Sequence, residues 1–309
     1  MISSLNIADL EAFAAVAEMR SIAKASTRLH LSQPAITRRL KNLEYQLGVK
    51  LFDRGARPMI LTPEGEETHR HARNVLSTAS ELQAAITPGK KIKGGFRLGF
   101  SASLADNLLR RPLDILRREF PSLRLTVSSD ESVDLLSAIR KLELDAAVIL
   151  LPDGRDLPDG IAGEMLRSDT IAVAVPQDFH FPKGAKLTDL SRQPWIVNPL
   201  GCSGRQALQN AFDRAGLPLE IALEISGTGL QLALIEAGRG LGVFLPYVVK
   251  ASRFGASIRI VRPPDFEPRL STWIAYRPNS DRLKQPIQTL RDALKSERQA
   301  SASNGTLRP

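Results

Sequence analysis

The most informative stretch of the 309-residue chain is Ser32-Gln33-Pro34-Ala35-Ile36-Thr37-Arg38-Arg39-Leu40. Ser32 is a typical helix N-cap residue, and Pro34 suits the first helical turn because a missing N–H costs little there. Apolar residues then recur every three or four positions from Ile36, and Gly48 follows as a helix C-terminal residue. The stretch therefore predicts a helix with one buried face and one polar, basic face.

Short elements surround this helix. Leu10, Phe13 and Val16 recur at helical spacing, and Ser21 is positioned to cap a second short helix. Beyond Gly48, two short apolar runs flank the loop 53–58, which predicts a small β-hairpin. Residues 1–62 are thus predicted to form an all-α winged helix-turn-helix.

Positive charge is concentrated in this region. The net charge of the whole chain is +9, and the segment from Arg20 to Arg57 holds nine Lys and Arg against Glu44 and Asp53, a net of +7. A local basic surface of this kind favours DNA, and the N-terminal half of a recognition helix reads base edges. Composition alone would equally fit a solvated basic face without base contacts. The residues predicted to contact double-stranded DNA are Ser32, Gln33, Pro34, Thr37, Arg38, Lys41, Arg54 and Arg57.

A long helix is predicted next, over residues 63–87. Thr62 precedes Pro63 and Glu64, an N-cap followed by an N1 proline and an acidic first turn. Its apolar residues alternate in steps of three and four, which is typical of a coiled-coil seam between two copies of a chain; packing on its own domain is the alternative. The seam residues are Ala72, Val75, Ala79, Leu82 and Ile86. Residues 88–95, rich in glycine and lysine, are predicted to be a hinge.

The rest of the chain alternates strand and helix patterns. The order β-α-β-α-β over 96–151 predicts a parallel sheet with helices on both faces. Further strands are predicted near 171–175, 195–197, 219–225, 243–245 and 270–276, with a last helix over 282–294. We therefore expect a Rossmann-like α/β domain over 96–296 and a disordered, polar tail over 297–309.

The N-terminal motifs resemble those of LysR-type transcriptional regulators. The resemblance comprises the stretch 32–40 together with Leu43-Glu44, Leu47-Gly48, Leu51-Phe52-Asp53-Arg54 and Leu61-Thr62-Pro63-Glu64-Gly65. It implies a sequence-specific DNA-binding regulator, a homodimer or homotetramer, with RNA polymerase a further candidate partner. It also implies a two-lobed effector-binding domain, with lobe 1 near 96–166 and 268–296 and lobe 2 near 167–267.

Four turns in this domain are candidates for holding a small-molecule effector. Each lies where a strand ends or a helix begins, and the N–H groups of helix N-termini bind anions. The candidate residues are Ser101, Ser103, Ser129, Cys202, Ser203 and Thr228. Each Ser or Thr could instead be only an N-cap. The sequence leaves the identity and charge of the effector open, and also a redox role for Cys202.

Other classes of protein are disfavoured. The single cysteine excludes a disulfide within the chain, and we find neither a signal peptide nor a run of apolar residues long enough for a membrane span, so we expect a cytoplasmic protein. We expect no metal or other cofactor, because no metal-ligand or nucleotide motif occurs. An enzyme is an alternative, but Gly99-Phe100-Ser101-Ala102-Ser103 lacks the final glycine of a nucleophile elbow. An architectural DNA-binding protein would not need a two-lobed domain.

Overall fold

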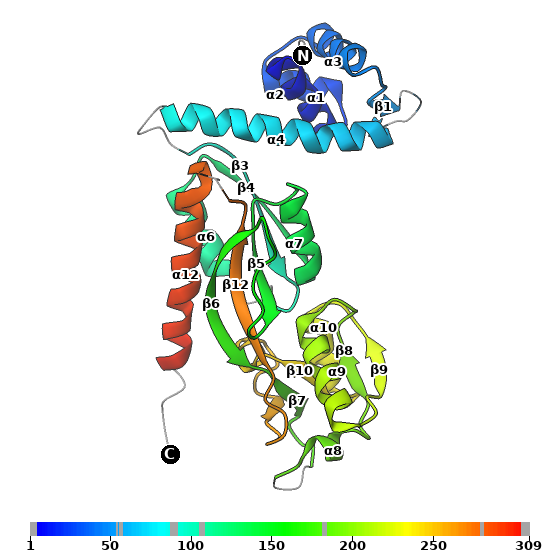
Figure 1. Ribbon diagram of the computed structural model, residues 1–309, viewed down its shortest axis with the longest axis vertical. Coiled ribbons are helices and arrows are strands. Elements are labelled where there is room, and N and C mark those ends of the chain that lie inside the picture. The colour runs from blue at the N-terminus through cyan, green and yellow to red at the C-terminus, as the bar shows by residue number, and fades with distance from the viewer. Residues whose placement is uncertain are drawn as a thin grey trace. The chain divides into compact units, whose positions relative to one another are not determined.

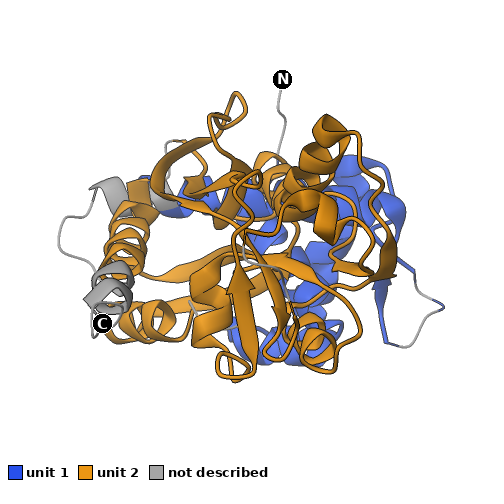
Figure 2. Cartoon of the chain, turned by 90° about the horizontal axis from the view of Figure 1, so that it is seen from below, with its two compact units in different colours: residues 1–90 blue, residues 91–309 orange. Residues whose placement is uncertain are grey.

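The computed structural model describes residues 5–53, 55, 58–86, 92–104, 109–180, 184–278 and 281–303. The chain divides into two compact units, residues 1–90 and residues 91–309 (Figure 2). Each unit is built around its own hydrophobic core, so we describe each by itself.

Unit 1 is a helical unit with a small hairpin (Figure 1). Its elements are α1 (Ile7–Met19), α2 (Ile22–Leu29), α3 (Gln33–Leu47), β1 (Phe52–Asp53), β2 (Ile60–Leu61) and α4 (Pro63–Ile86). The predicted N-caps are present, because the hydroxyls of Ser21, Ser32 and Thr62 each accept a backbone N–H of the first helical turn. Gly48 ends α3 in the left-handed region at φ 72°, which glycine adopts without strain.

The core of unit 1 fixes which face of α3 points outward. Ile36 and Leu43 are fully buried against Phe13 of α1, whose ring meets that of Phe52 edge-on at 5.5 Å. The predicted apolar stripe is therefore confirmed at Ile36, Leu40 and Leu43, whereas Leu47 at its end is exposed, and the opposite face of α3 is left to solvent. Arg39 is not on that free face, since its guanidinium donates to the Ala8 carbonyl of α1 at 3.1 Å.

Unit 2 begins with lobe 1, which is built on a five-stranded sheet in the order β4-β3-β5-β12-β6. The strands are β3 (Gly94–Ser101), β4 (Leu123–Asp130), β5 (Ala146–Pro152), β6 (Ala162–Thr170) and β12 (Arg269–Tyr276). β3, β4 and β5 are parallel as predicted, whereas β12 is antiparallel to both β5 and β6. The helices are α6 (Arg110–Glu119), α7 (Ser132–Arg140) and α12 (Lys284–Ser303), preceded by the 3₁₀ turn η1 (Asp281–Leu283). α6 and α12 cover one face of the sheet and α7 the other (Figure 1).

Lobe 2 carries two smaller sheets. β7 (Ala172–Pro176) pairs antiparallel with β10 (Gly242–Phe244) and β11 (Ile258–Val261), and β8 (Trp195–Val197) pairs parallel with β9 (Ile221–Glu224). Its helices are α8 (Leu187–Leu190), α9 (Ser203–Ala215), α10 (Thr228–Glu236) and α11 (Pro246–Ala251). The Trp195 ring is fully buried and meets Phe212 of α9 edge-on at 5.5 Å.

Several predicted boundaries differ from the structure. β6 and β11 were not predicted; β6 is an edge strand whose residues are nearly all half-buried, so it lacks the alternating pattern of a strand. β6 continues to Thr170 and β12 starts at Arg269, so the chain passes between the lobes near 170 and 268, where crossings near 167 and 267 were expected. Residues 94–95 of the predicted hinge belong to β3, and α12 continues to Ser303, so the tail predicted from 297 is helical up to there.

Candidate functional site

Five of the predicted DNA-contacting side chains lie together on α3. Gln33, Pro34, Thr37, Arg38 and Lys41 lie side by side on one open, shallow surface of the free face of the helix. All are exposed except Thr37, which is half-buried and donates its hydroxyl to the Gln33 carbonyl at 2.9 Å. The face therefore offers an amide, a guanidinium, an ammonium and apolar carbons to a partner.

The remaining predicted contacts have different settings. Ser32 is exposed, but its hydroxyl already accepts the Ala35 N–H at 3.3 Å, which makes it the helix cap. Arg54 and Arg57 lie outside the described residues. Beside them, Asp53 accepts the Gly55 N–H at 2.8 Å and so shapes the turn after β1.

Buried Glu44 holds the start of the hairpin against α3. Its carboxylate accepts the Leu51 N–H at 3.0 Å and lies 3.4 Å from the Lys50 ammonium. The acidic residue that the sequence places inside the basic region therefore faces inward. The negative charge of Glu44 therefore does not lie on the exposed basic face of α3.

A second group of polar residues lies where the two lobes of unit 2 meet. The Ser103 hydroxyl of lobe 1 is 3.6 Å from the Cys202 sulfur of lobe 2, and Thr228 at the start of α10 donates to the Ala102 carbonyl at 3.4 Å. Ser203, the first residue of α9, donates to the Leu150 carbonyl of β5 at 2.8 Å. We call these three interactions the cross-lobe contacts. Four of the six predicted effector residues take part in them.

The other two predicted effector residues are placed differently. Ser101 is buried at the end of β3, beside the cross-lobe contacts in sequence. Ser129 was expected in a turn, but β4 continues to Asp130 and leaves Ser129 exposed on the edge strand. Polar residues are ordinary on exposed edge strands, so Ser128 and Ser129 gave a misleading turn signal.

Glu131 is the acidic residue of the lobe boundary that the sequence analysis missed. It follows β4 directly, its side chain is only 9% exposed, and it shares a hydrogen bond with the Cys202 thiol. Burial raises the pKa of the Glu131 carboxyl, and the charges of Asp130 and Asp134 raise it further. Its position at the start of α7, matching those of Ser203 and Thr228 at α9 and α10, is the signal that would have found it.

The chemistry of Cys202 follows from this setting. Burial raises the pKa of the thiol, and the nearby Glu131 carboxylate raises it further. Because the thiolate is the reactive form of cysteine, this environment keeps Cys202 protonated and unreactive at neutral pH.

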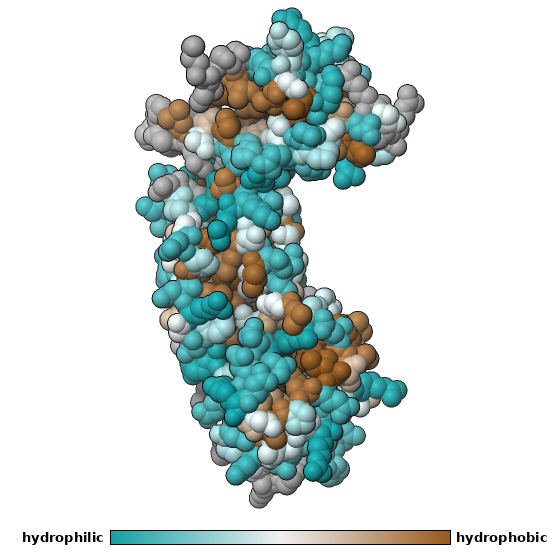
Figure 3. All heavy atoms as spheres, turned by 45° about the vertical axis from the view of Figure 1, so that its right-hand side comes forward, coloured by the Kyte–Doolittle hydropathy of each residue, from teal (hydrophilic) through white to brown (hydrophobic). Residues whose placement is uncertain are grey.

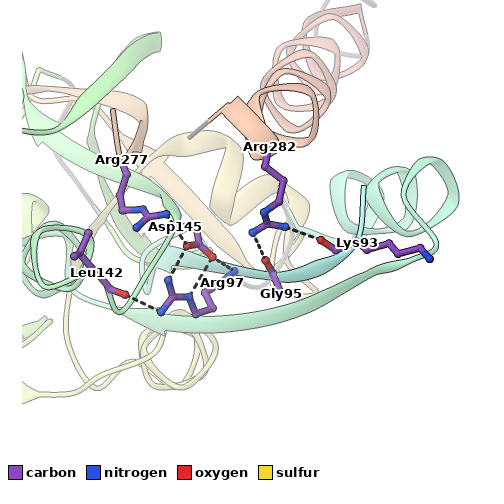
Figure 4. Close-up of polar contacts among 7 residues, drawn as sticks. All are labelled: Lys93, Gly95, Arg97, Leu142, Asp145, Arg277 and Arg282. Atoms are coloured by element: carbon purple, nitrogen blue, oxygen red, sulfur yellow. Dashed lines mark hydrogen bonds and ion pairs between the residues drawn. The ribbon is translucent and has the colours of Figure 1, made fainter. Parts of the chain in front are cut away.

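A buried ionic network lies at the opposite end of the lobe 1 strands (Figure 4). Asp145, 2% exposed, accepts hydrogen bonds from the Arg97 backbone N–H at 2.8 Å and from its guanidinium at 3.1 and 2.7 Å. Arg277, which directly follows β12, approaches the same carboxylate at 3.8 Å. Arg282 in η1 donates to the carbonyls of Lys93 and Gly95, each at 2.9 Å, and so holds the chain where it enters β3.

Exposed apolar residues mark two further surfaces. On α4, Val75 is 47% and Leu82 63% exposed, and Ala79 is half-buried. The side chain of Ile86 lies outside the described residues. Ala72, by contrast, is 2% exposed and belongs to the core of unit 1, because α4 packs on α1 near its start. Ala72 is therefore not accessible to a partner helix and does not belong to the predicted seam.

The second apolar surface is on lobe 2. Apolar side chains gather there on the face that carries α10 and β9 (Figure 3). Leu200 and Leu230 are 79% and 56% exposed, and Ile221 and Leu223 of the edge strand β9 are also exposed. Large apolar patches on a folded unit commonly mark interaction surfaces.

Two protein families match consecutive parts of the chain. Residues 7–66 match the family described as "Bacterial regulatory helix-turn-helix protein, lysR family", and residues 89–299 match "LysR substrate binding domain". The chain belongs to the LysR family. It is a DNA-binding transcriptional regulator with an effector-binding domain, and the family excludes the enzyme alternative.

Individual LysR relatives and structures agree with this assignment. The chain is 30% identical to a "Probable hydrogen peroxide-inducible genes activator" of Mycobacterium avium over 258 residues, 81% of this chain and 82% of the relative. A full-length OxyR variant of Pseudomonas aeruginosa has a TM-score of 0.75 at 22% identity, covering 94% of this chain and 95% of that one. Full-length CbnR complexed with its target DNA has a TM-score of 0.63 at 23% identity, covering 94% and 100%. Because these two solved structures are less than 25% identical to this chain, they support its fold alone.

No described group of three or more His, Cys, Asp or Glu side chains is arranged to hold a metal ion. None of the described helices is both long and apolar enough to cross a membrane.

Proposed function

We propose that α3 enters the major groove of double-stranded DNA and reads base edges there. The observation that supports this is that Gln33, Pro34, Thr37, Arg38 and Lys41 lie side by side on one open, basic surface of the helix. A Gln amide pairs with adenine and an Arg guanidinium with guanine, while carbon atoms of Pro or Thr touch a thymine methyl group. We assign Ser32 to a phosphate, and Arg54 and Arg57 of the wing to the minor groove or backbone.

Footprinting across a salt series tests this reading. The purified protein is mixed with the DNA upstream of its own gene and with excess competitor DNA. Protection of an interrupted inverted repeat that persists in the presence of competitor is the expected result. Protection that spreads along the whole fragment and vanishes with modest salt would leave only phosphate contacts and refute base reading.

We further propose that a small-molecule effector binds between the lobes of unit 2, at the cross-lobe contacts. Ser103, Cys202, Ser203 and Thr228 converge there, together with Ser101 and with Glu131, which replaces Ser129 in the assignment. The hydroxyls of Ser103, Ser203 and Thr228 form hydrogen bonds across the lobes. An effector bound there would replace these hydrogen bonds with bonds to itself. The test is effector-dependent footprinting with Ser203→Ala, which should lose the response while retaining DNA binding.

We propose that ligand binding, and not oxidation of Cys202, controls this regulator. Some relatives are named as hydrogen peroxide-inducible genes activators. In this chain the only cysteine is buried beside Glu131, and both the burial and that carboxylate disfavour the thiolate form. Peroxide treatment that shifted the footprint of the wild type but not of Cys202→Ser would refute the proposal.

Self-association is proposed through two separate surfaces. The seam of Val75, Ala79, Leu82 and Ile86 on α4 would pair two copies, and the apolar face of lobe 2 would pair others. Two independent self-complementary surfaces allow a homodimer to become a homotetramer. Sedimentation of Leu82→Asp and of Leu223→Asp, each against the wild type, separates the two contacts.

A further inference from the structure

Lobe 1 carries a cavity of about 240 Å³ that shares no lining residue with the cross-lobe contacts. We call it the lobe 1 cavity. It lies between β6, β12 and the start of α12. Its volume is below the roughly 300–1,000 Å³ of sites that hold drug-sized ligands, so it suits a smaller molecule.

Part of the lining of the lobe 1 cavity is apolar. Ile274 of β12 and Ile287 of α12 are 1% and 6% exposed, and the ring of Tyr276 lies beside them in the lining. An apolar group placed against these side chains would leave water at little structural cost, because the surface it meets is already formed.

The rest of the lining carries charges of both signs. Arg277, Lys284 and Arg291 are cationic, and Glu164 and Asp281 are anionic. Glu164 lies 3.4 Å from Arg291, with the two side chains 41% and 31% exposed, and it also pairs with Lys295. Ion pairs with this exposure contribute little and exchange partners easily.

Two of these charges are still available to a ligand. Lys284 and Asp281 are both exposed, and neither forms an ion pair within the part of the chain that the structure describes. A ligand with one charge would pair with the lining residues of the opposite sign. The remaining charged residues of the lining would then face its apolar part. A ligand with both charges and a compact apolar group would satisfy the whole lining.

We propose that the lobe 1 cavity binds an α-amino acid with an apolar side chain. The carboxylate faces Arg277 and Lys284, the ammonium faces Glu164 and Asp281, and the side chain lies on Ile274 and Ile287. This assignment does not depend on where the effector of the cross-lobe contacts binds. It gives the regulator a second ligand site in the lobe that adjoins the linker segment.

Methyl NMR of the full-length chain locates the ligand. With the isoleucine δ1 methyl groups labelled, L-leucine, L-valine and L-phenylalanine serve as probes. We expect at least one probe to shift the Ile274 and Ile287 signals saturably and to leave Ile196 and Ile235 of lobe 2 unchanged. No saturable shift with any of the three at millimolar concentration overturns the proposal.

Calorimetric titration tests the charge requirement, shown here for L-leucine. The analogues are 4-methylpentanoate, which lacks the ammonium, and 3-methylbutylamine, which lacks the carboxylate; each should bind at least about tenfold more weakly, because it loses charge-assisted hydrogen bonds. Equal binding of either analogue would refute recognition of both charges. For L-valine or L-phenylalanine the corresponding des-amino and des-carboxy compounds apply.

Matched variants complete the design. Lys284→Gln and Asp281→Asn, both at exposed positions, should weaken binding of the amino acid, whereas Lys250→Gln, which removes an exposed charge of lobe 2, should not. Ser203→Ala should also leave the affinity unchanged. Loss of binding in Ser203→Ala with wild-type affinity in Lys284→Gln would move the amino acid to the cross-lobe contacts and overturn the proposal.

Discussion

Replacing Asp145 by alanine should destabilise unit 2 strongly. The Asp145 carboxylate is 2% exposed and accepts three hydrogen bonds from Arg97, whose side chain is 11% exposed (Figure 4). In the variant, the Arg97 guanidinium would keep only its bond to the Leu142 carbonyl, at 2.7 Å, and its charge would be buried without the Asp145 counter-ion. Breaking a buried ion pair by removing one partner costs about 3–5 kcal/mol. We expect the free energy of unfolding of unit 2 to fall by that amount.

Tryptophan fluorescence during urea unfolding measures this loss for unit 2 alone. The chain has two tryptophans, Trp195 and Trp273, and both lie in residues 91–309. Asp145→Asn keeps an acceptor oxygen but loses the charge, so its midpoint should fall between those of Asp145→Ala and the wild type.

An exposed ion pair provides the matched control. Asp292 is 63% exposed and lies 2.8 Å from Arg291, so Asp292→Ala should cost less than about 1 kcal/mol. If Asp145→Ala were no more destabilising than Asp292→Ala, water would be replacing the lost hydrogen bonds. The network would then contribute nothing beyond a surface pair, and our reasoning would be wrong.

Four further outcomes are expected. Arg38→Ala should weaken specific DNA binding by roughly 1–3 kcal/mol and relax one base position, whereas an equal loss on all DNA sequences in a mobility-shift assay would make Arg38 a phosphate contact. Leu82→Asp should sediment as a smaller species than the wild type; an unchanged oligomer would show that the α4 seam does not hold the copies together. Because burial raises the pKa of the Glu131 carboxyl, the folded chain holds that proton more tightly and loses stability as pH rises past the unfolded value. Glu131→Gln should therefore raise the urea midpoint more at about pH 8 than at about pH 4, and a pH-independent difference would contradict this. Cys202 should react with Ellman's reagent far more slowly in the folded chain than in urea, and equal rates would show an open thiol.

Local signals explain what could be predicted from the sequence. The caps at Ser21, Ser32 and Thr62 and the left-handed Gly48 depend on atoms within four residues of each other, so their residue types carry the information. The recognition face of α3 follows from the same short range, because the apolar stripe fixes which residues remain outside.

Contacts between distant segments explain what could not. The lobe boundaries depend on the pairing of β6 with β12, in which Thr170 lies opposite Arg269. Ala72 continues the seam spacing perfectly in the sequence, yet the core of unit 1 buries it. Glu131 is buried at the lobe boundary and shares a hydrogen bond with Cys202, which lies 71 positions further along the chain in the other lobe. The spacing of residues within one segment does not indicate which distant residues will contact that segment.

The strands β3 and β5 link the two ends of lobe 1 physically. β3 starts at Gly94, next to the carbonyls held by Arg282, and ends at Ser101, just before Ala102 and Ser103 of the cross-lobe contacts. β5 starts directly after Asp145, and its Leu150 accepts Ser203 from the other lobe. The cross-lobe contacts and the Arg97, Asp145 and Arg282 bonds are therefore joined by two strands of eight and seven residues.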